Sequence, residues 1–420
     1  MPRNKQNAVD KKLAFAARPI HTLYAGADRY SANLSAKLSK LALESVKEYG
    51  ASATQFARAL GGSPQMEAAR NSVKSKGVAQ QAYERMLRKL SLEPIEDFRA
   101  DFEDGFGVRS DKAEDEAVVA VAKEYALSIK NKSAPRHFGI RLKPFSPEFA
   151  KRSLRTLQIF MRTLSAETKG NYPFGTIITL PKLRSPEEVK TICKAIDRFE
   201  KLYKIRRGTH RLEILCETAD VFLSKTGEFA LPNIIKAGGT RLSSIHMGAF
   251  DFTSELGVGL LGQSNLHEFC QFARFLMKLA TAHTEIQVVD SITNILPLVE
   301  HRHPRLSKQQ QNQNKASVWR GWRAHAESIR KALSLGILQG WDLHPAQLPV
   351  RFFVTYEYFL NGFDQAVSRL AKFHESMQRS SRDLAVFDDA ATIRGLRNFL
   401  AQGYECGAFT KEQLEFTNFS

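Results

Sequence analysis

The 420-residue sequence has few cysteines and no long apolar run. Its four cysteines lie far apart and form no C-x-x-C pair. This spacing argues against a zinc site or a disulfide framework and favours a reducing compartment. No stretch approaches the ~20 apolar residues that a membrane span requires. The N-terminal segment 1–18 is polar and lacks the apolar core of a secretion signal. We therefore expect a cytoplasmic protein that does not enter a membrane.

Several motifs of nucleotide-binding proteins and hydrolases are also missing. No G-x-G-x-x-G follows the first apolar run, and no G-x-x-x-x-G-K-[ST] occurs anywhere. An open, doubly wound nucleotide-binding sheet is therefore the weaker alternative for the fold. No Gly-x-Ser-x-Gly occurs, so the sequence predicts no serine nucleophile of the hydrolase type.

Acidic residues are in the minority. The sequence has 61 Lys and Arg against 44 Asp and Glu, a net charge of +17. Part of this excess is local, because residues 302–331 carry eight Lys or Arg and one acid, Glu327. No RNP motif, zinc finger or helix-turn-helix accompanies these residues, and aromatic residues do not alternate with them as in a stacking platform. We expect an anionic small substrate or a plain basic surface rather than nucleic acid.

Six short apolar runs end on charged residues at intervals of 34 to 41 residues. The charged ends are Glu103–Asp104, Arg141, Lys182, Glu217, Asp251 and Asp290. One strand with its crossover helix takes about 30 residues or more. A first strand at 19–28 and an eighth at 336–345 complete the series. Eight alternating strands and helices predict a (β/α)8 TIM barrel, whose chemistry lies at the carboxyl ends of the strands.

The barrel is predicted to span residues 19–350, with additions. A helical excursion over 29–93 is too long for one crossover helix, and the polar, glutamine-rich segment 301–320 is expected to be an exposed insertion or mobile loop. Residues 351–420 are helical and amphipathic, and we expect a C-terminal helical subdomain, a lid or an oligomer contact.

Four helices have clear signals in the sequence. Ser110 and Ser185 are typical N-caps, each with acids in the following turn, and Pro147 suits the first turn of a helix over 147–165. A further helix is expected over 319–335.

Glu217 and Asp251 end neighbouring predicted strands, so their carboxylates are expected side by side at the barrel mouth. Two adjacent carboxylates repel each other unless a cation or a shared proton offsets their charge. Ligation by a few carboxylates, with water and substrate completing the shell, is typical of Mg²⁺, and Mn²⁺ would also fit. The alternative is that each acid caps a helix or pairs with a base. We favour the metal site.

Arg141 is the expected anion-binding residue, since its fixed donors suit a carboxylate or a phosphate. Its structural alternative is an ion pair with Glu103 or Asp104, and both roles can coexist. Asp101, Glu103 and Asp104 form a dense acidic cluster that is expected to orient Arg141 or hold metal-bound water. Lys182 is expected to neutralise acids across the mouth.

Four further residues near the predicted strand ends have less certain roles. Gly248 allows a close backbone approach to a ligand. His246 lies within an apolar strand and is expected to be a core histidine whose polar atoms are satisfied. His344 is either an acid–base group or a packing group, and Asp290 has no assigned role.

Together these segments resemble the HpcH/HpaI aldolase and citrate lyase family, nearest the citrate lyase beta subunit and malyl-CoA lyase branch. The resemblance covers roughly residues 19–28 and 95–350. The segments that carry it are RPIHTLYAGADR, ADFEDGFGVRSDKAEDEA, GIRLKPF, ITLPKLRSPEEV, LEILCETADVF, LSSIHMGAFDFTSELG, VVDSI and DLHPAQL.

The resemblance implies a TIM barrel of the phosphoenolpyruvate/pyruvate type, Mg²⁺ at Glu217 and Asp251, and Arg141 on the substrate carboxylate. The sequence departs from the family at three places. Leu142-Lys143 stand where the family has Asn, and Ala25-Gly26 replace Val-Pro. The segment 407–416 lacks the Asp of the family's C-terminal lid.

These features predict a Mg²⁺-dependent carbon–carbon lyase or aldolase that acts on a 2-oxo or hydroxy acid, with or without CoA, through an enolate. The predicted catalytic residues are Arg141, Glu103 and Asp104, and the predicted substrate contacts are Arg141, Gly248, Lys182 and Asp101. A homo-oligomer is expected. Two alternatives remain open: phosphoryl transfer on a phosphoenolpyruvate-like substrate, and a non-catalytic barrel that binds nucleic acid or a partner through its basic insertion.

Overall fold

The computed structural model describes residues 18–61, 73–169, 171–379 and 390–415. Nearly all of the predicted arm 1–18 therefore lies outside the described residues, as do parts of the excursion 29–93 and of the tail 351–420. None of the described helices is long and apolar enough to cross a membrane.

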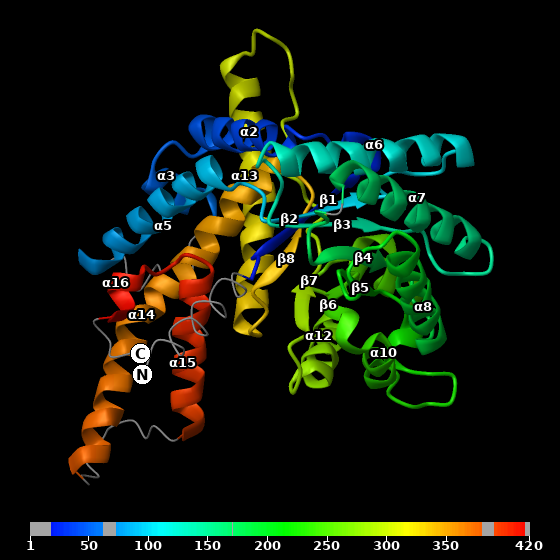
Figure 1. Cartoon of the computed structure of the whole chain (residues 1–420). Coiled ribbons are helices and arrows are strands. Elements are labelled where there is room, and N and C mark those ends of the chain that lie inside the picture. Colours follow the sequence, from blue (N-terminus) through cyan, green and yellow to red (C-terminus); the bar gives the residue numbers. More distant parts are fainter. Residues whose placement is uncertain (1–17, 62–72, 170, 380–389, 416–420) are drawn as a thin grey trace.

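Eight parallel strands close into a barrel in chain order, each hydrogen-bonded to the next and the eighth to the first. This confirms the predicted TIM barrel (Figure 1). The strands are β1 (His21–Gly26), β2 (Asp97–Asp101), β3 (His137–Arg141), β4 (Thr176–Leu180), β5 (His210–Cys216), β6 (Leu242–Met247), β7 (Gln287–Asp290) and β8 (Gln339–Asp342).

Helices surround the barrel and extend it on one side. Those of the barrel and the excursion are α2 (Leu34–Tyr49), α3 (Ala53–Ala59), α5 (Val73–Leu92), α6 (Asp111–Lys130), α7 (Ala150–Thr168), α8 (Pro186–Leu202), α9 (Ala219–Phe222), α10 (Leu231–Gly238), α11 (Ala249–Glu255), α12 (Glu268–Thr281) and α13 (Lys308–Ser334). The C-terminal helices are α14 (Leu348–Arg379), α15 (Ala390–Glu405) and α16 (Lys411–Glu415). Short 3-10 turns are η1 (Ala27–Arg29), η2 (Gly239–Arg241), η3 (Leu260–Gly262) and η4 (Pro345–Gln347).

The predicted N-caps are confirmed at two helices. The hydroxyls of Ser110 and Ser185 accept hydrogen bonds from backbone N–H groups in the first turns of α6 and α8. The start predicted for α7 was wrong. This helix begins at Ala150, three residues after Pro147, because the chain first turns at Ser146, whose carbonyl accepts the amides of Phe149 and Ala150.

Of the two alternatives expected for 301–320, the mobile loop is wrong from residue 308 onward, while most residues of 302–313 are exposed, as an exposed insertion would be. The residues from 308 onward form the first turns of the 27-residue helix α13. Ser307 and Gln310 form a capping box at its start, in which each side-chain oxygen accepts the backbone N–H of the other residue. Further along, Trp322 is fully buried and donates to the Ala346 carbonyl. The cap and this packing hold a polar segment in a helix although it has no apolar period.

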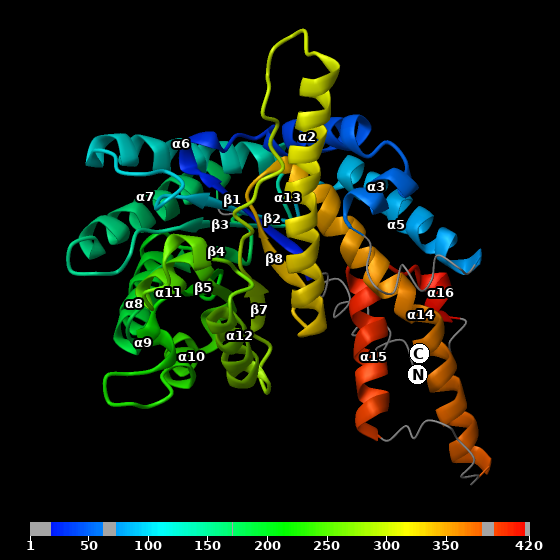
Figure 2. The ribbon, with the colours of Figure 1, turned by 180° about the vertical axis from the view of Figure 1, so that it is seen from behind.

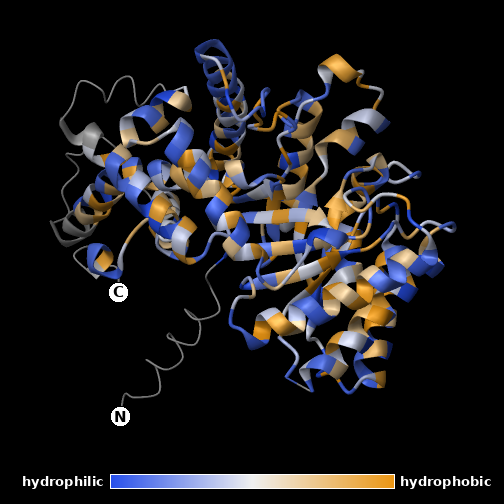
Figure 3. Ribbon diagram, turned by 90° about the horizontal axis from the view of Figure 1, so that it is seen from above, coloured by the Kyte–Doolittle hydropathy of each residue, from blue (hydrophilic) through white to orange (hydrophobic). Residues whose placement is uncertain are grey.

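The C-terminal helices lie beside the excursion rather than over the helices that follow β4–β6. Figures 1 and 2 show α14, α15 and α16 together with α5 on one side of the barrel. Apolar and polar residues alternate along the helices of the barrel (Figure 3), and the buried residues of α6, α7 and α8 are mostly apolar. The main core includes Phe98, Phe138 and Phe160 between the strands and these helices.

Candidate active site

Asp101 and Arg141 form a paired unit at the carboxyl ends of β2 and β3. Arg141 donates to both Asp101 oxygens, over 2.7 Å from Nε and 2.5 Å from Nη2. The same oxygens also accept the backbone amides of Glu103 and Gly105. Asp101 therefore fixes both the guanidinium and the loop after β2. Its predicted contact with substrate stays a prediction.

Lys182 lies among three acids, as the sequence predicted. Its Nζ is 2.5 Å from Glu103 Oε1, 3.2 Å from Asp104 and 3.6 Å from Asp251. Burial opposes the ammonium charge, but Glu103 and Asp251 raise the pKa of Lys182 above its ordinary value. Lys182 is therefore a fixed positive charge at neutral pH and is unsuited to act as a base.

Glu103 bridges the two cations of the site. Its Oε2 lies 2.9 Å from Arg141 Nη1 but makes no hydrogen bond among the described residues. Burial, and to a lesser extent Asp104, raise the pKa of Glu103, whereas Arg141 and Lys182 lower it. Glu103 can therefore hold a proton more readily than an ordinary glutamate.

Glu217 follows β5 and is almost completely buried. Its Oε1 accepts the Lys182 backbone amide over 2.6 Å. Burial raises the pKa of Glu217 to about 8, and the nearby charges of Glu103 and Asp251 add to this effect. Asp251 lies not at the end of β6 but in the first turn of α11, where its side chain is 42% exposed. The predicted pair is thus one buried and one accessible carboxylate.

Two glycines make room for the acids of the site. A Cβ at Gly248 would lie 2.4 Å from both Cβ and Oε2 of Glu217, and the Gly248 amide already donates to the Cys216 carbonyl. A Cβ at Gly26 would lie 2.3 Å from the Gly105 carbonyl oxygen. Gly26, which stands where the resembled family has proline, is therefore required by the close approach of the Gly105 backbone. Gly248 supports Glu217, while its substrate contact stays a prediction.

The floor beneath Arg141 was not anticipated from the sequence. The guanidinium lies 5.4 Å from the ring centre of Tyr24, whose hydroxyl donates to Glu213 Oε1. Arg99 donates to both Glu213 oxygens, and His246 Nε2 lies 2.6 Å from Glu213 Oε2. The available signal was strand alternation, which points every second residue of β1, β2 and β5 into the barrel.

The remaining candidates have partners other than the acids at the barrel mouth. His246 is fully buried in the core, as expected; its Nδ1 accepts the Trp341 N–H, whereas its Nε2 makes no hydrogen bond among the described residues although it lies 2.6 Å from Glu213 Oε2. His344 Nδ1 accepts the Ala346 amide at the start of η4. Asp290 pairs with buried Arg274. In place of the family's Asn, Leu142 is buried in the core and Lys143 Nζ donates to the Phe102 carbonyl.

The segment that was compared with a lid packs on the C-terminal helices. Phe409, within 407–416, contacts the rings of Phe363 and Phe399, and Ala408 is fully buried. Among the described residues of this segment, no acid contacts the barrel-mouth acids.

The site carries more negative than positive charge. Asp101, Glu103, Asp104, Glu217 and Asp251 face only Arg141 and Lys182, so full ionisation leaves three negative charges in excess. Burial is the main cause of the raised pKa values of Glu217 and Glu103, and the neighbouring acids add to it. A divalent cation would relieve it, and carboxylate oxygens are the ligands that Mg²⁺ prefers. The donor set therefore fits the predicted metal. No three His, Cys, Asp or Glu of the described chain are by themselves arranged around an ion, so substrate and water would have to supply further ligands.

Comparison with known proteins supports the fold. A citrate lyase from Burkholderia xenovorans has 16% sequence identity and a TM-score of 0.55, over 80% of this chain and 92% of that one. A magnesium/glyoxylate complex of Haloferax volcanii malate synthase has 15% sequence identity and a TM-score of 0.45, over 77% of this chain and 85% of that one. RipC from Yersinia pestis has 15% sequence identity and a TM-score of 0.40, over 63% of this chain and 91% of that one. The similarity to the citrate lyase shows a shared fold. The other two similarities are too weak to show one, because their TM-scores are below 0.5.

At the level of sequence, residues 14–419 match the family described as "Domain of unknown function (DUF6986)". No curated protein matches the sequence. The expected likeness to citrate lyase thus holds for the fold, while a closer place in the aldolase and citrate lyase family stays a prediction.

Proposed function

This chain belongs to the DUF6986 family, and from its barrel-mouth residues we propose that it is a divalent-metal-dependent carbon–carbon lyase or aldolase. The substrate class is a 2-oxo or hydroxy acid, with or without CoA, and the reaction passes through an enolate. The observation that carries this proposal is Glu217, a buried carboxylate with a pKa of about 8 beside Glu103 and Asp251. Carboxylates with raised pKa values that lie together at the mouth of a TIM barrel are typical of an active site.

Glu217 and Asp251 would hold the metal. Bound there, a divalent cation would polarise the carbonyl of a 2-oxo acid and stabilise the enolate oxyanion. Glu217 contributes a rigid ligand, because its Oε1 is fixed by the Lys182 amide and its other oxygen packs against Gly248. The half-exposed side chain of Asp251 leaves one side of the site open to substrate.

Arg141 is the residue proposed to bind the substrate carboxylate. Its Nε and Nη2 are committed to Asp101, whereas Nη1 touches Glu103 without making a hydrogen bond to it. Nη1 is therefore the donor that a substrate carboxylate can take. Because Asp101 and the Tyr24 ring hold the guanidinium in place, little conformational entropy is lost when the acid binds.

Glu103 is the residue proposed to hold and release the proton of the reaction. Burial raises its pKa, so it holds a proton more readily than an ordinary glutamate, and it lies next to Arg141, where the substrate acid would sit. Lys182 stays charged and offsets the developing negative charge, and Asp104 steadies the ammonium from the exposed side.

The proposal is tested by screening hydroxy acids and their CoA thioesters for Mg²⁺-dependent release of a 2-oxo acid. We expect activity with at least one compound, its loss on removing Mg²⁺, and a decrease of at least 100-fold in Glu217→Gln. Glu228→Gln, at an exposed acid of the loop after α9, is the matched control and should keep its activity. Phosphate release from phosphoenolpyruvate without carbon–carbon cleavage would favour the phosphoryl-transfer alternative. If no compound reacts, or if Glu217→Gln is fully active, the proposed reaction is wrong.

A further inference from the structure

The barrel has a second opening, at the amino ends of its strands. A cavity of about 1080 Å³ lies there, lined by the first residues of several strands. Among them are Asp97 of β2, Gln287 of β7 and Gln339 of β8. Asp97 and Asp101 stand at opposite ends of β2, about 13 Å apart at the rise of a strand. The cavity therefore opens at the other end of the barrel from the candidate active site, and of the residues described there it shares only Arg99, in the floor beneath Arg141.

The floor of the cavity is unusually polar for a TIM barrel. Such barrels are normally filled by layers of bulky, branched side chains. Here the floor consists of buried Arg99, Asp97, Ser244 and Gln339. Arg99 is neutralised by Asp97 and Glu213, and Ser244 and Gln339 are hydrogen-bonded to these same acids. The floor is thus a satisfied, rigid polar surface that can accept a polar ligand without rearranging.

The rim has positive charge that the protein does not neutralise. Arg136 lines the cavity but is paired with Glu96, and Glu285 is paired with Arg18. Arg211 and Lys236 also line the cavity, and neither forms an ion pair with a carboxylate of the described chain. Two cations therefore face the opening without an ion-paired acid from the described part of the chain.

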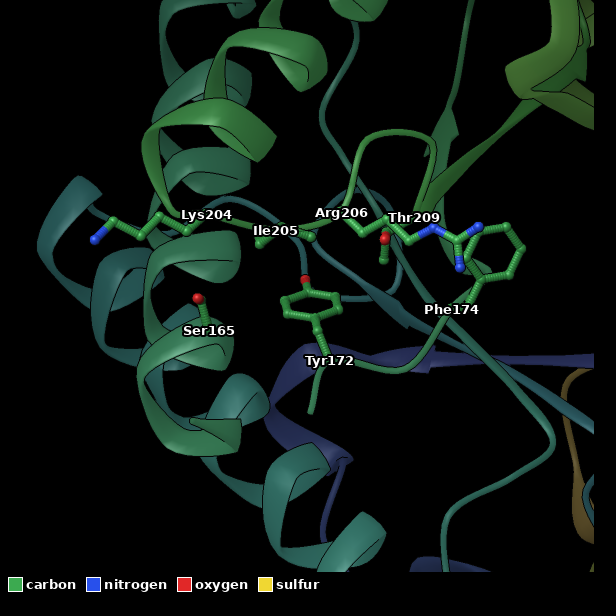
Figure 4. Close-up of a pocket in the computed structure, with 7 residues that line it drawn as sticks. All are labelled: Ser165, Tyr172, Phe174, Lys204, Ile205, Arg206 and Thr209. Carbon is green, nitrogen blue, oxygen red and sulfur yellow. The ribbon is translucent and has the colours of Figure 1, made fainter. Parts of the chain in front are cut away.

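An exposed aromatic ring holds one of these cations. Phe174 is 49% exposed, which is unusual for so large an apolar side chain, and the Arg211 guanidinium lies 5.4 Å from its ring centre. The Arg206 guanidinium lies 5.6 Å from the same ring centre. Figure 4 shows these two side chains next to each other. Arg211 also donates to the Thr240 carbonyl over 2.5 Å. The ring and this hydrogen bond fix the guanidinium at the rim.

We propose that this cavity is a second ligand site, which binds a small anionic molecule through a phosphate or carboxylate group on Arg211 and Lys236. Fixed guanidinium and ammonium groups at the rim bind the anionic group. The side-chain amide of Gln287 also lines the cavity and can donate to the part of the ligand that reaches inward, whereas Ser243 and Gln339 already donate to groups of the protein. The volume would accommodate a molecule of ordinary metabolite size, since ligand pockets span about 300–1000 Å³.

The test is isothermal titration of the full-length protein, in metal-free buffer, with two probes: inorganic pyrophosphate for the phosphate group and citrate for the carboxylate group. We expect saturable binding of at least one probe, and the stronger probe identifies the preferred group. The double variant Arg211→Gln/Lys236→Gln should weaken this binding at least tenfold. The control Lys190→Gln/Lys225→Gln removes the same charge at two exposed lysines outside the cavity and should change it by less than twofold.

Glu217→Gln separates this site from the proposed active site. Binding to the cavity should be unchanged in that variant, whatever its effect on metal binding or activity. Three results would overturn the proposal: neither probe binds, the double variant binds as wild type does, or Glu217→Gln abolishes binding and so places the probe at the other mouth.

Discussion

The backbone amide of Lys182 donates to Glu217 Oε1 over 2.6 Å. Lys182 has a φ of 47°, in the left-handed region that residues other than glycine seldom adopt. This conformation costs on the order of 1 kcal/mol. It lets one residue present its amide to Glu217 and its ammonium to Glu103. Through Lys182, the segment after β4 thus contacts both carboxylates whose pKa is raised, Glu217 and Glu103.

Glu217→Gln is expected to stabilise the metal-free protein near pH 8. The carboxyl titrates near 4.5 in its ordinary state and near 8 in the fold. Between these values the folded chain keeps a proton that the unfolded chain has lost, so stability falls as pH rises. The uncharged glutamine side chain of the variant removes this loss. The free energy of unfolding of the variant should therefore exceed that of wild type by up to about 4 kcal/mol at pH 8, and the difference should vanish near pH 4. Urea unfolding at several pH values measures it, and a constant difference between the two proteins would contradict the shifted pKa.

Mg²⁺ affinity should rise with pH. The cation needs Glu217 ionised, and burial holds the pKa of this group near 8. Below that pH each unit should strengthen binding by up to about tenfold, and above it the dependence should flatten. Titration calorimetry between pH 6 and 9 measures this slope. An affinity that is independent of pH would mean that Glu217 is not a ligand.

Gly248→Ala should impair the site without unfolding the barrel. The new methyl group would meet Glu217 at 2.4 Å, so the carboxylate must move away from its position on the Lys182 amide. We expect at least a tenfold loss of Mg²⁺ affinity with little change in the circular dichroism spectrum. Gly259→Ala is the matched control, because a Cβ there meets no atom within 4 Å and its φ is −68°. Equal behaviour of the two variants would refute the steric role of Gly248.

Asp101→Asn should destabilise the protein and weaken substrate binding. It leaves the buried Arg141 guanidinium without its fully charged partner, and breaking such a pair costs about 3–5 kcal/mol. Glu285→Gln removes an acid paired with Arg18 whose side chain is 98% exposed, and it should cost less than about 1 kcal/mol. Thermal unfolding compares the two variants. Similar small losses would show that Asp101 does not hold Arg141.

An exposed apolar stripe on α12 gives the expected homo-oligomer a testable location. Phe269, Phe272, Phe275 and Leu279 are 45–69% exposed, which is unusual for aromatic and aliphatic side chains on one helix. We expect light scattering to show more than one chain per particle, and Phe272→Asp/Phe275→Asp to reduce that number. A monomeric wild type would rule out the oligomer, and an unchanged double variant would place its contact elsewhere.

The fold was predictable because the strand signals are local. Apolar runs such as TIITL and LEILC are flanked by turns and helix caps, and their spacing specifies a βα repeat. The helix predicted over 319–335 is confirmed as the second half of α13, whereas its first turns were missed because KQQQNQNKA has no apolar period. Its capping box at Ser307 and Gln310 was nonetheless present in the sequence.

The candidate site was predictable only as a set of residue types. Strand order predicts that Glu217, Asp251, Arg141 and Lys182 lie at one mouth of the barrel. It does not predict which of these side chains contact one another. That Asp101 occupies two of the three donor groups of Arg141, or that Gly248 accommodates Glu217, depends on side-chain packing between strands far apart in the chain. The polar barrel floor at Arg99 and Glu213 depends on the same long-range packing.

The most direct test of the account is calorimetric titration of Mg²⁺ at pH 8 into wild type, Glu217→Gln and the control Glu228→Gln, with and without glyoxylate. The account predicts one saturable site in wild type and in the control, strengthened by glyoxylate, and at least tenfold weaker binding in Glu217→Gln. Failure of wild type to bind Mg²⁺, or equal binding by Glu217→Gln, would contradict the assignment of this barrel mouth as a metal-dependent active site.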